Sequence, residues 1–208
     1  MIKSFDPIER YDAKILILGT LPSAASLASG YNYAHPRNAF WYIMQALAQN
    51  RPGDIREAIA SGRIDELIEI DPEKLPGFPA RKKLLIDNRI ALWDCLRSAE
   101  REGGSLDSSI DAATEIPNDI PGFLRSHPQI RAVFFNGTKS ESVFRRLVAP
   151  VIEADSELAA ELERRPVLYR RLPSTSPANA GMTPAKKLEA WAVILNVLHG
   201  LQELRVES

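Results

Sequence analysis

The chain has 208 residues, 45% of them hydrophobic and 25% charged, so it is long enough to bury one hydrophobic core. Its single cysteine, Cys95, excludes an internal disulfide, and its three scattered histidines lack the spacing of a zinc site. The formal net charge of -1 gives no indication of a nucleic-acid partner. We therefore expect one domain with no metal and no cofactor.

The N-terminal residues contain no basic segment followed by a long apolar one. No apolar run approaches the ~20 residues that a membrane span requires. We expect a cytoplasmic protein that has no membrane partner and acts as a monomer.

The first predicted element is a strand at residues 14–18, an apolar run that ends before Gly19 and Pro22 and suits a strand buried on both faces. A loop is expected next. From Pro36, apolar residues recur at helical spacing, and proline is well tolerated at the first position of a helix. The stretch YNYAHPRNAFW (31–41) is therefore expected to span a loop and the start of a helix.

The rest of the chain alternates between strand and helix patterns. Residues 51–88 hold short helical patterns interrupted by prolines and are interpreted as a peripheral helical excursion. Further strands are predicted at 90–93, 132–135 and 167–172, and helices at 121–126, 140–147 and 184–198. This alternation predicts a three-layer α/β/α sandwich around a mainly parallel, four-stranded sheet. We expect residues 1–208 to form a single domain.

Each predicted strand ends in residues suited to a binding site. The four endings are GTLPS (19–23), Trp93-Asp94, Asn136-Gly137-Thr138 and LPSTSPAN (172–179). In open α/β sheets the ligand crevice lies beyond the carboxyl ends of the strands, so the endings are expected to converge. Singly, GTLPS and Asn136-Gly137 also fit simple turns. The hydroxyl-rich loop between Pro173 and Pro177 can donate hydrogen bonds to a phosphate without carrying charge.

The aromatic stretch at 31–41 offers candidate contacts to a planar ligand. Tyr31 or Tyr33 could stack on a nucleobase, which is worth ~1–3 kcal/mol per base, or could be a core tyrosine with a satisfied hydroxyl. Asn38 either caps the helix locally or points into the crevice to hold a water or a base edge. Phe40 and Trp41 are expected in the core.

These motifs resemble those of a known superfamily. Residues 19–41 resemble the first active-site motif of the mismatch-specific branch of the uracil-DNA glycosylase superfamily, and LPSTSPAN resembles its later phosphate-pinching loop. Together with Trp93-Asp94, residues 104–110 and residues 135–137, they look most like the hypoxanthine-releasing, or deoxyinosine, DNA glycosylases. The resemblance covers roughly residues 10–195.

The resemblance implies a uracil-DNA glycosylase-like fold and an enzyme of base excision repair. Such an enzyme hydrolyses the N-glycosidic bond of a deaminated base, here most of all hypoxanthine, flipped out of double-stranded or single-stranded DNA. Leu21 occupies the position where most of the superfamily has an aspartate or asparagine that orients water. The deoxyinosine branch shares this lack and is thought to use the asparagine of its HPRN segment, which is Asn38.

The expected site combines this resemblance with the chemistry of the side chains. Asn38 is the candidate catalytic residue. Asp94 and Asn136 could read the edge of hypoxanthine, although Asp94 could instead be structural. The candidate base-binding residues are Gly19, Thr20, Leu21, Tyr33, Asp94 and Asn136, and the candidate DNA-binding residues are Pro22, Ser23, His35, Pro173, Ser174, Thr175 and Ser176. No residue is expected to bind a metal.

Two alternatives stay open. The first keeps the fold and makes mismatched uracil the substrate. The second is a non-catalytic nucleic-acid-binding domain, which has lost its chemistry together with the acidic or amide residue that Leu21 replaces.

Overall fold

The computed structural model of the chain describes residues 1–102 and 107–200. Part of the motif at 104–110, namely residues 104–106, lies outside this range. No helix of the described part is long and apolar enough to cross a membrane.

A four-stranded parallel sheet forms the centre of the fold. Its strands are β2 (Ile15–Gly19), β3 (Ile90–Asp94), β6 (Ala132–Asn136) and β7 (Leu168–Leu172), in the order β3-β2-β6-β7. Every residue of β2 and β6 is buried, which explains their continuous apolar runs. The predicted sheet is confirmed, and each strand lies within about one residue of its predicted bounds because buried parallel strands leave a strong apolar signal.

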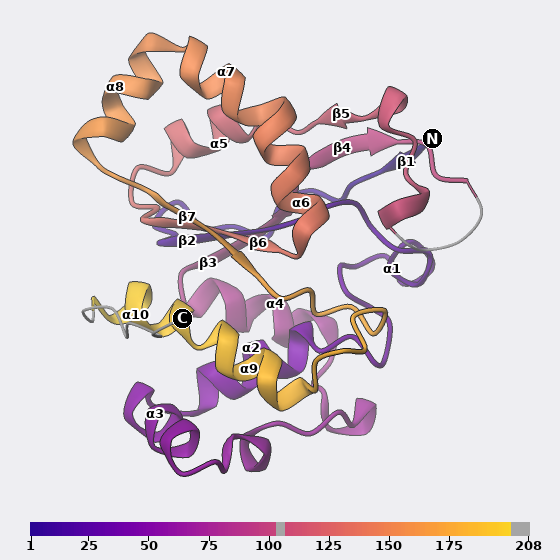
Figure 1. The fold of residues 1–208 in the computed structure, drawn as a ribbon, viewed down its shortest axis with the longest axis vertical. Helices are drawn as coiled ribbons and strands as arrows, with labels where there is room; N and C mark the ends of the chain where they lie inside the picture. Colours follow the sequence, from indigo (N-terminus) through magenta and orange to yellow (C-terminus); the bar gives the residue numbers. More distant parts are fainter. Residues whose placement is uncertain (103–106, 201–208) are drawn as a thin grey trace.

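Helices cover both faces of this sheet, as Figure 1 shows. One layer contains α2 (Phe40–Gln49), α3 (Pro52–Ala60), α4 (Phe78–Asp87), α9 (Pro184–Trp191) and α10 (Val193–His199); the other contains α5 (Ile120–Ser126), α6 (Thr138–Val143), α7 (Ala149–Ala154) and α8 (Ser156–Arg164). Ile15 and Ile17 of β2 pack into the first layer, whereas Leu16 and Leu18 pack into the second. The predicted α/β/α sandwich is thus confirmed.

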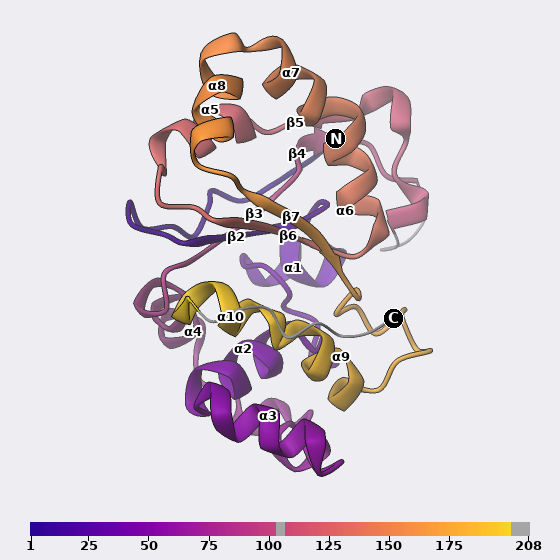
Figure 2. The ribbon, with the colours of Figure 1, turned by 60° about the vertical axis from the view of Figure 1, so that its left-hand side comes forward.

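Residues 51–88 form α3, two short 3-10 helices (Ile64–Leu67 and Pro72–Lys74) and α4. Figure 2 shows α3 on the outside of its layer, farther from the sheet than α2. In contrast, α4 contacts the sheet, and its Leu85 is fully buried in the same core cluster as β3 residues Ile90 and Leu92.

The helix predicted from Pro36 was placed too early, because α2 begins at Phe40. The Asn38 side chain explains the difference, since its Oδ1 accepts a hydrogen bond from the Phe40 amide at 3.0 Å. An asparagine that bonds to the backbone in this way favours the position before a helix over a position within it. Asn38 therefore precedes the first helical turn instead of lying inside it.

Several short elements were not predicted. The segment after Pro22, which was expected to be a loop, contains α1 (Ala24–Ser29), and Ser23 caps its start by accepting from the Ser26 amide. A three-stranded antiparallel sheet of β1 (Ile2–Lys3), β4 (Leu96–Ala99) and β5 (Ile116–Pro117) also forms. Helix α8 was not predicted either.

Two predicted helices have different bounds in the structure. The helix predicted at 140–147 is part of a longer run in which a π-helical turn (Phe144–Val148) joins α6 to α7. The helix predicted at 184–198 is two helices, α9 and α10, that meet at Ala192.

We expect Gly19→Ala to destabilise the protein by about 1–3 kcal/mol, the usual cost of an extra methyl group in a packed interior. A Cβ atom on Gly19 would lie 2.3 Å from Asp94 Oδ1 and 2.8 Å from the Tyr33 hydroxyl. Denaturant titration gives the free energy of unfolding. Gly181→Ala is the matched control, because its Cβ would meet nothing within 4 Å. Equal stability of the two variants would contradict the close approach at Gly19.

Candidate active site

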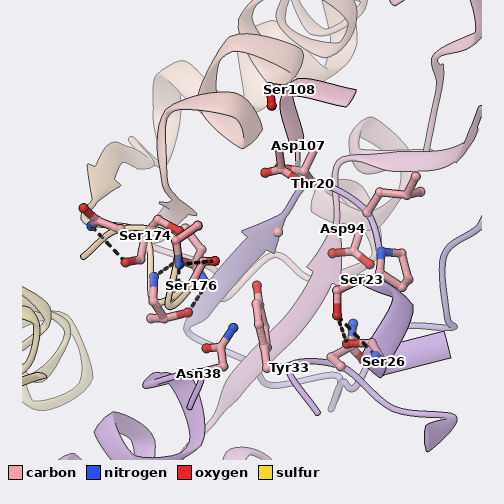
Figure 3. Close-up of a pocket in the computed structure, with 18 residues that line it drawn as sticks. Thr20, Ser23, Ser26, Tyr33, Asn38, Asp94, Asp107, Ser108, Ser174 and Ser176 are labelled. Atoms are coloured by element: carbon pink, nitrogen blue, oxygen red, sulfur yellow. Dashed lines mark hydrogen bonds between the residues drawn. The ribbon is translucent and has the colours of Figure 1, made fainter. Parts of the chain in front are cut away.

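A pocket with a volume of about 360 Å³ lies at the carboxyl ends of β2, β3 and β6. Its lining comes from all four predicted strand endings, which therefore converge as expected. The predicted site residues that line it are Gly19, Thr20, Leu21, Pro22, Ser23, Tyr33, Asn38, Asp94, Asn136, Ser174, Thr175 and Ser176. Figure 3 shows their side chains around this space.

Two predicted DNA-binding residues do not line the pocket. His35 borders a smaller neighbouring pocket of about 240 Å³, and its Nδ1 accepts from the Arg37 amide at 3.1 Å. Pro173 lies at the start of the hydroxyl-rich loop at 173–177, here called the serine-rich loop, and its carbonyl accepts a hydrogen bond from Trp191 Nε1. Their contacts to DNA stay predictions.

Tyr33, rather than Tyr31, is the aromatic residue at the pocket. Phe40 stacks on one face of the Tyr33 ring, with centroids 4.1 Å apart, so a planar ligand can stack only on the other face. The residue has a φ of +56°, an uncommon and strained conformation for a tyrosine. Tyr31 packs instead against Phe78 of α4, and Arg81 lies over its ring. Phe40 is buried, as predicted, and so is Trp41.

The Tyr33 hydroxyl is buried and has no hydrogen-bond partner among the described residues. Burial raises its pKa far above the ordinary tyrosine value, and the nearby charge of Asp94 raises it further. The side-chain amide of Asn136, which is near this hydroxyl, acts on the pKa in the opposite direction. Tyr33 is therefore a neutral hydroxyl at the pocket that can bond with a ligand or water.

Asn38 borders the pocket just before α2. Because its Oδ1 accepts from the Phe40 amide, the side-chain amide is held in one orientation. An amide oxygen has two lone pairs, so Asn38 Oδ1 can still accept one hydrogen from a water. Figure 3 shows Asn38 beside Tyr33 on the same side of the pocket.

Asn136 holds the serine-rich loop in place. Its Nδ2 donates to Thr175 Oγ1, and its Oδ1 accepts from the Thr175 amide, both at 2.9 Å. Thr175 is completely buried, and its carbonyl accepts from the Ala39 amide at 3.0 Å, which ties the loop to the start of α2. The side chain of Thr175 therefore supports the loop from inside. Asn136 could read a base only through its remaining hydrogen-bonding positions, so this role stays a prediction.

Ser174 and Ser176 are partly exposed on the pocket side of the same loop. Ser174 Oγ accepts from the Ser176 amide at 3.3 Å. The loop lies close to Gly137, where a Cβ atom would be only 3.0 Å from Ser174 Cβ and where φ is +98°. Glycine suits Gly137 because it permits this backbone conformation and this close approach.

Asp94 ends β3 beside Gly19, its partner in the sheet register. It is 4% exposed, and its Oδ2 has no hydrogen-bond partner among the described residues. Burial raises the pKa of Asp94 to about 7, to which the negative charge of Asp107 contributes, while Arg101 acts in the opposite direction.

Two charged residues of this site were not predicted, Asp107 and Arg101. Asp107 lines the pocket and accepts a hydrogen bond from Thr20 Oγ1 at 2.9 Å. The Arg101 side chain is 3% exposed and donates to the Pro22 carbonyl at 2.8 Å. The motif at 104–110 indicated the region of Asp107 but no role for it, and nothing in the sequence indicated Arg101. Arg101 does not line the pocket itself, and the lining residues besides Asp107 that were not predicted are Ser26, Asn32, Ser108, Ala178 and Asn179.

Within residues 1–102 and 107–200, no three histidine, cysteine, aspartate or glutamate side chains are grouped so that they could hold a metal ion. The residues that line the pocket present hydroxyl, amide and carboxyl groups around an aromatic face. This combination suits a planar, polar ligand with an attached phosphate.

Comparison with known proteins gives the family, although no protein-family model matches the chain. The chain is 34% identical over 142 residues to a hypoxanthine DNA glycosylase of Methanosarcina acetivorans, a match that covers 67% of this chain and 74% of the relative. It is 28% identical over 138 residues to a hypoxanthine DNA glycosylase of Methanosarcina barkeri, covering 66% and 72%.

The fold is also that of a solved structure. The NMR structure of a proposed uracil DNA glycosylase from Methanosarcina acetivorans matches with a TM-score of 0.62 and 26% identity, over 93% of this chain and 98% of that one. The match extends beyond the pocket to the sheet and both helical layers. The chain therefore belongs to the hypoxanthine DNA glycosylases, which share the uracil-DNA glycosylase fold.

Proposed function

We propose that this protein is a monofunctional DNA glycosylase that hydrolyses the N-glycosidic bond of deoxyinosine in DNA and releases hypoxanthine. One observation carries the proposal: a single pocket joins Tyr33, Asn38 and the serine-rich loop. Relatives with 34% and 28% identity bear the name hypoxanthine DNA glycosylase, which supports this substrate.

The target nucleotide must leave the duplex before it can enter such a pocket. Extrusion costs a few kcal/mol and least for a mispaired or damaged base, and hypoxanthine pairs weakly with thymine. The open face of Tyr33 repays part of the cost, because stacking on an aromatic ring is worth ~1–3 kcal/mol per base. Phe40 fixes the plane of the Tyr33 ring from behind, so the receiving surface is formed before the base arrives.

Asn38 is the residue that we place at the sugar. The second lone pair of its Oδ1 accepts a hydrogen from a water and directs that water toward C1′. The bond from the Phe40 amide keeps the oxygen from turning away. Since an amide is a very weak base, Asn38 positions the water and does not remove its proton.

The GTLPS loop faces the departing base. Leu21 is buried at the pocket wall and offers no polar side chain. The backbone amides of Leu21 and Ser23 donate no hydrogen bond to any residue in the described part of the chain. We propose that these amides donate to the base as it accepts negative charge, since fixed donors need no reorganisation during the reaction.

The serine-rich loop is proposed to grip the DNA backbone. Ser174 and Ser176 present hydroxyl groups, and the bonds between Asn136 and Thr175 hold the loop in shape. Contacts of this kind position the strand without reading its sequence. The partner that we propose for this loop is DNA that contains a damaged base.

The decisive experiment offers otherwise identical duplexes that contain inosine, uracil or xanthine and measures strand breaks after alkaline treatment. We expect breaks at inosine, because the pocket has polar groups for the edge of a deaminated purine. Breaks at uracil alone would instead identify a mismatch-specific uracil-DNA glycosylase. Tight binding to the inosine duplex without any abasic product would identify a non-catalytic binding domain.

We expect Asn38→Ala to slow single-turnover release of hypoxanthine by about 10²-fold, at the low end of the range for proton-transfer groups, because an amide only orients the water. Affinity for a duplex with the uncleavable 2′-fluoro analogue of deoxyinosine should not change. Gln49→Ala is the matched control, because it removes an exposed amide at the other end of α2 and Gln49 is not among the residues that line the pocket. An unchanged rate in Asn38→Ala would reject the role at the sugar.

We expect Tyr33→Ala to weaken binding of the same 2′-fluoro duplex by ~1–3 kcal/mol, because the stacking surface for one base is lost. Tyr33→Phe keeps the ring and removes only the unpaired hydroxyl, so it should lose much less affinity than the alanine variant. Fluorescence anisotropy measures both. If alanine and phenylalanine variants bind equally well, the base does not stack on this ring.

A further inference from the structure

Buried polar groups that lack a hydrogen-bond partner among the described residues lie at one wall of the pocket and behind it. They are the Tyr33 hydroxyl and Asp94 Oδ2, whose residues line the pocket, and Nε and Nη2 of Arg101, which does not line it. A buried polar atom without a hydrogen bond destabilises the folded protein, so such atoms are retained where a ligand or water satisfies them. Figure 3 shows Asp94 across the pocket from Ser174 and Ser176. The unsatisfied wall therefore faces the space that the extruded base would occupy.

This wall holds the carboxyl groups of Asp94 and Asp107, and the guanidinium group of Arg101 acts on both electrostatically. Asp94 is surrounded by Asp107, Arg101, Tyr33 and Cys95. Asp107 contacts Thr20, and Arg101 Nη2 approaches its Oδ1 only to 3.8 Å. Lys139 also acts on Asp107 electrostatically, but its ammonium group is paired with Glu115 at 2.7 Å.

This surplus of acid favours retention of a proton in the pocket. Burial and the charge of Asp107 bring the pKa of Asp94 to about 7, and burial also raises the pKa of Asp107 above its ordinary value. Near neutral pH the Asp94 carboxyl is therefore present in both its protonated and its ionised form. A group with such a pKa can give a proton and later take one back.

A departing purine needs such a proton. When the bond between C1′ and N9 breaks, its electron pair stays on the base, and the resulting anion is a poor leaving group. Hypoxanthine carries an acceptor nitrogen at N7, and a proton placed there neutralises the charge. Pyrimidine bases have no equivalent of N7, so a proton donor at this wall would matter most for purine substrates.

We propose that Asp94 is the general acid that protonates N7 of the departing hypoxanthine, and that Asp107 and Arg101 are positioning residues that keep this proton available. The proposal rests on the glycosylase function proposed above. The bond between C1′ and N9 breaks with its electrons on the base, and the proton moves from Asp94 to N7, so hypoxanthine leaves neutral. Water adds its oxygen to C1′, and its released proton returns to Asp94. No oxidant or reductant is required.

The geometry at Gly19 supports this assignment. Asp94 Oδ1 and the Tyr33 hydroxyl lie within 2.3 and 2.8 Å of the position that a Cβ atom on Gly19 would occupy. The acid thus lies beside the ring on which the base is proposed to stack, and Oδ2 is left without a partner. Thr20 holds one oxygen of Asp107 toward the same wall.

The test compares wild type and Asp94→Asn in single-turnover cleavage of inosine DNA across pH. The protonated form of Asp94 is the active one, so the wild-type rate should be highest below about pH 7 and fall about tenfold per pH unit above it. Asp94→Asn cannot supply a proton, so its rate should be lower by about 10²-fold or more at acidic pH and should lack this decline. Asp87→Asn, which changes an exposed acid of α4 paired with Lys83, should behave as wild type.

A second substrate separates proton donation from a structural role. In 7-deaza-deoxyinosine the N7 atom is replaced by carbon and cannot accept a proton. We expect wild type and Asp94→Asn to cleave this substrate equally slowly, whereas a misshapen pocket would slow both substrates by the same factor. Equal loss on both substrates, or a wild-type pH profile in Asp94→Asn, would overturn the proposal.

Asp107→Asn supplies an independent readout. Replacing Asp107 removes a negative charge near Asp94 and so lowers the pKa of Asp94. The midpoint of the pH profile should therefore move to lower pH while the decline persists, and an unmoved midpoint would contradict the coupling. If the wild type itself released no hypoxanthine, the proposed function would fail; if it cleaved without the expected pH profile, only the acid role of Asp94 would fail.

Discussion

The close approach of β2 and β3 at their carboxyl ends is the constraint on which the pocket depends. Gly19 is paired with Asp94 in the register of the sheet, and the absence of a side chain at Gly19 leaves room for Asp94 and Tyr33. Both groups consequently reach the pocket from neighbouring elements while remaining buried. A parallel sheet supplies this arrangement because its strands all end at the same edge.

A second set of contacts joins the far side of the pocket to the same sheet. Asn136 ends β6 and bonds twice to Thr175, whose carbonyl in turn accepts from Ala39 before α2. The serine-rich loop, the third strand of the sheet and the Asn38 turn are thereby linked through buried hydrogen bonds. Such bonds are strong in a low-dielectric interior, so the loop is shaped before DNA binds.

Some residues of the pocket have features that lower the stability of the folded protein. Tyr33 has a left-handed backbone conformation and an unpaired hydroxyl, and Asp94 is a buried acid with one unpaired oxygen. Each of these features is unfavourable in the free protein. Proteins commonly tolerate such local conflicts where a ligand is bound or chemistry occurs, because the bound ligand then forms the missing hydrogen bonds. Tyr33 and Asp94, which carry these unfavourable features, are also two of the residues that we place in the reaction.

Local sequence patterns determined the parallel sheet and the motifs at its strand ends, because strands buried on both faces require continuous apolar runs and abrupt endings. The contacts between distant segments depended on tertiary structure alone. Asn38 was expected inside the helix, yet it precedes the helix and its oxygen accepts from the Phe40 amide. The bonds from Asn136 to Thr175, which join two distant segments, were not predicted. The tertiary fold brings Arg101 and Asp107 beside Asp94 through β4, and no short-range pattern encodes this proximity, since charge coupling and burial depend on distance in space.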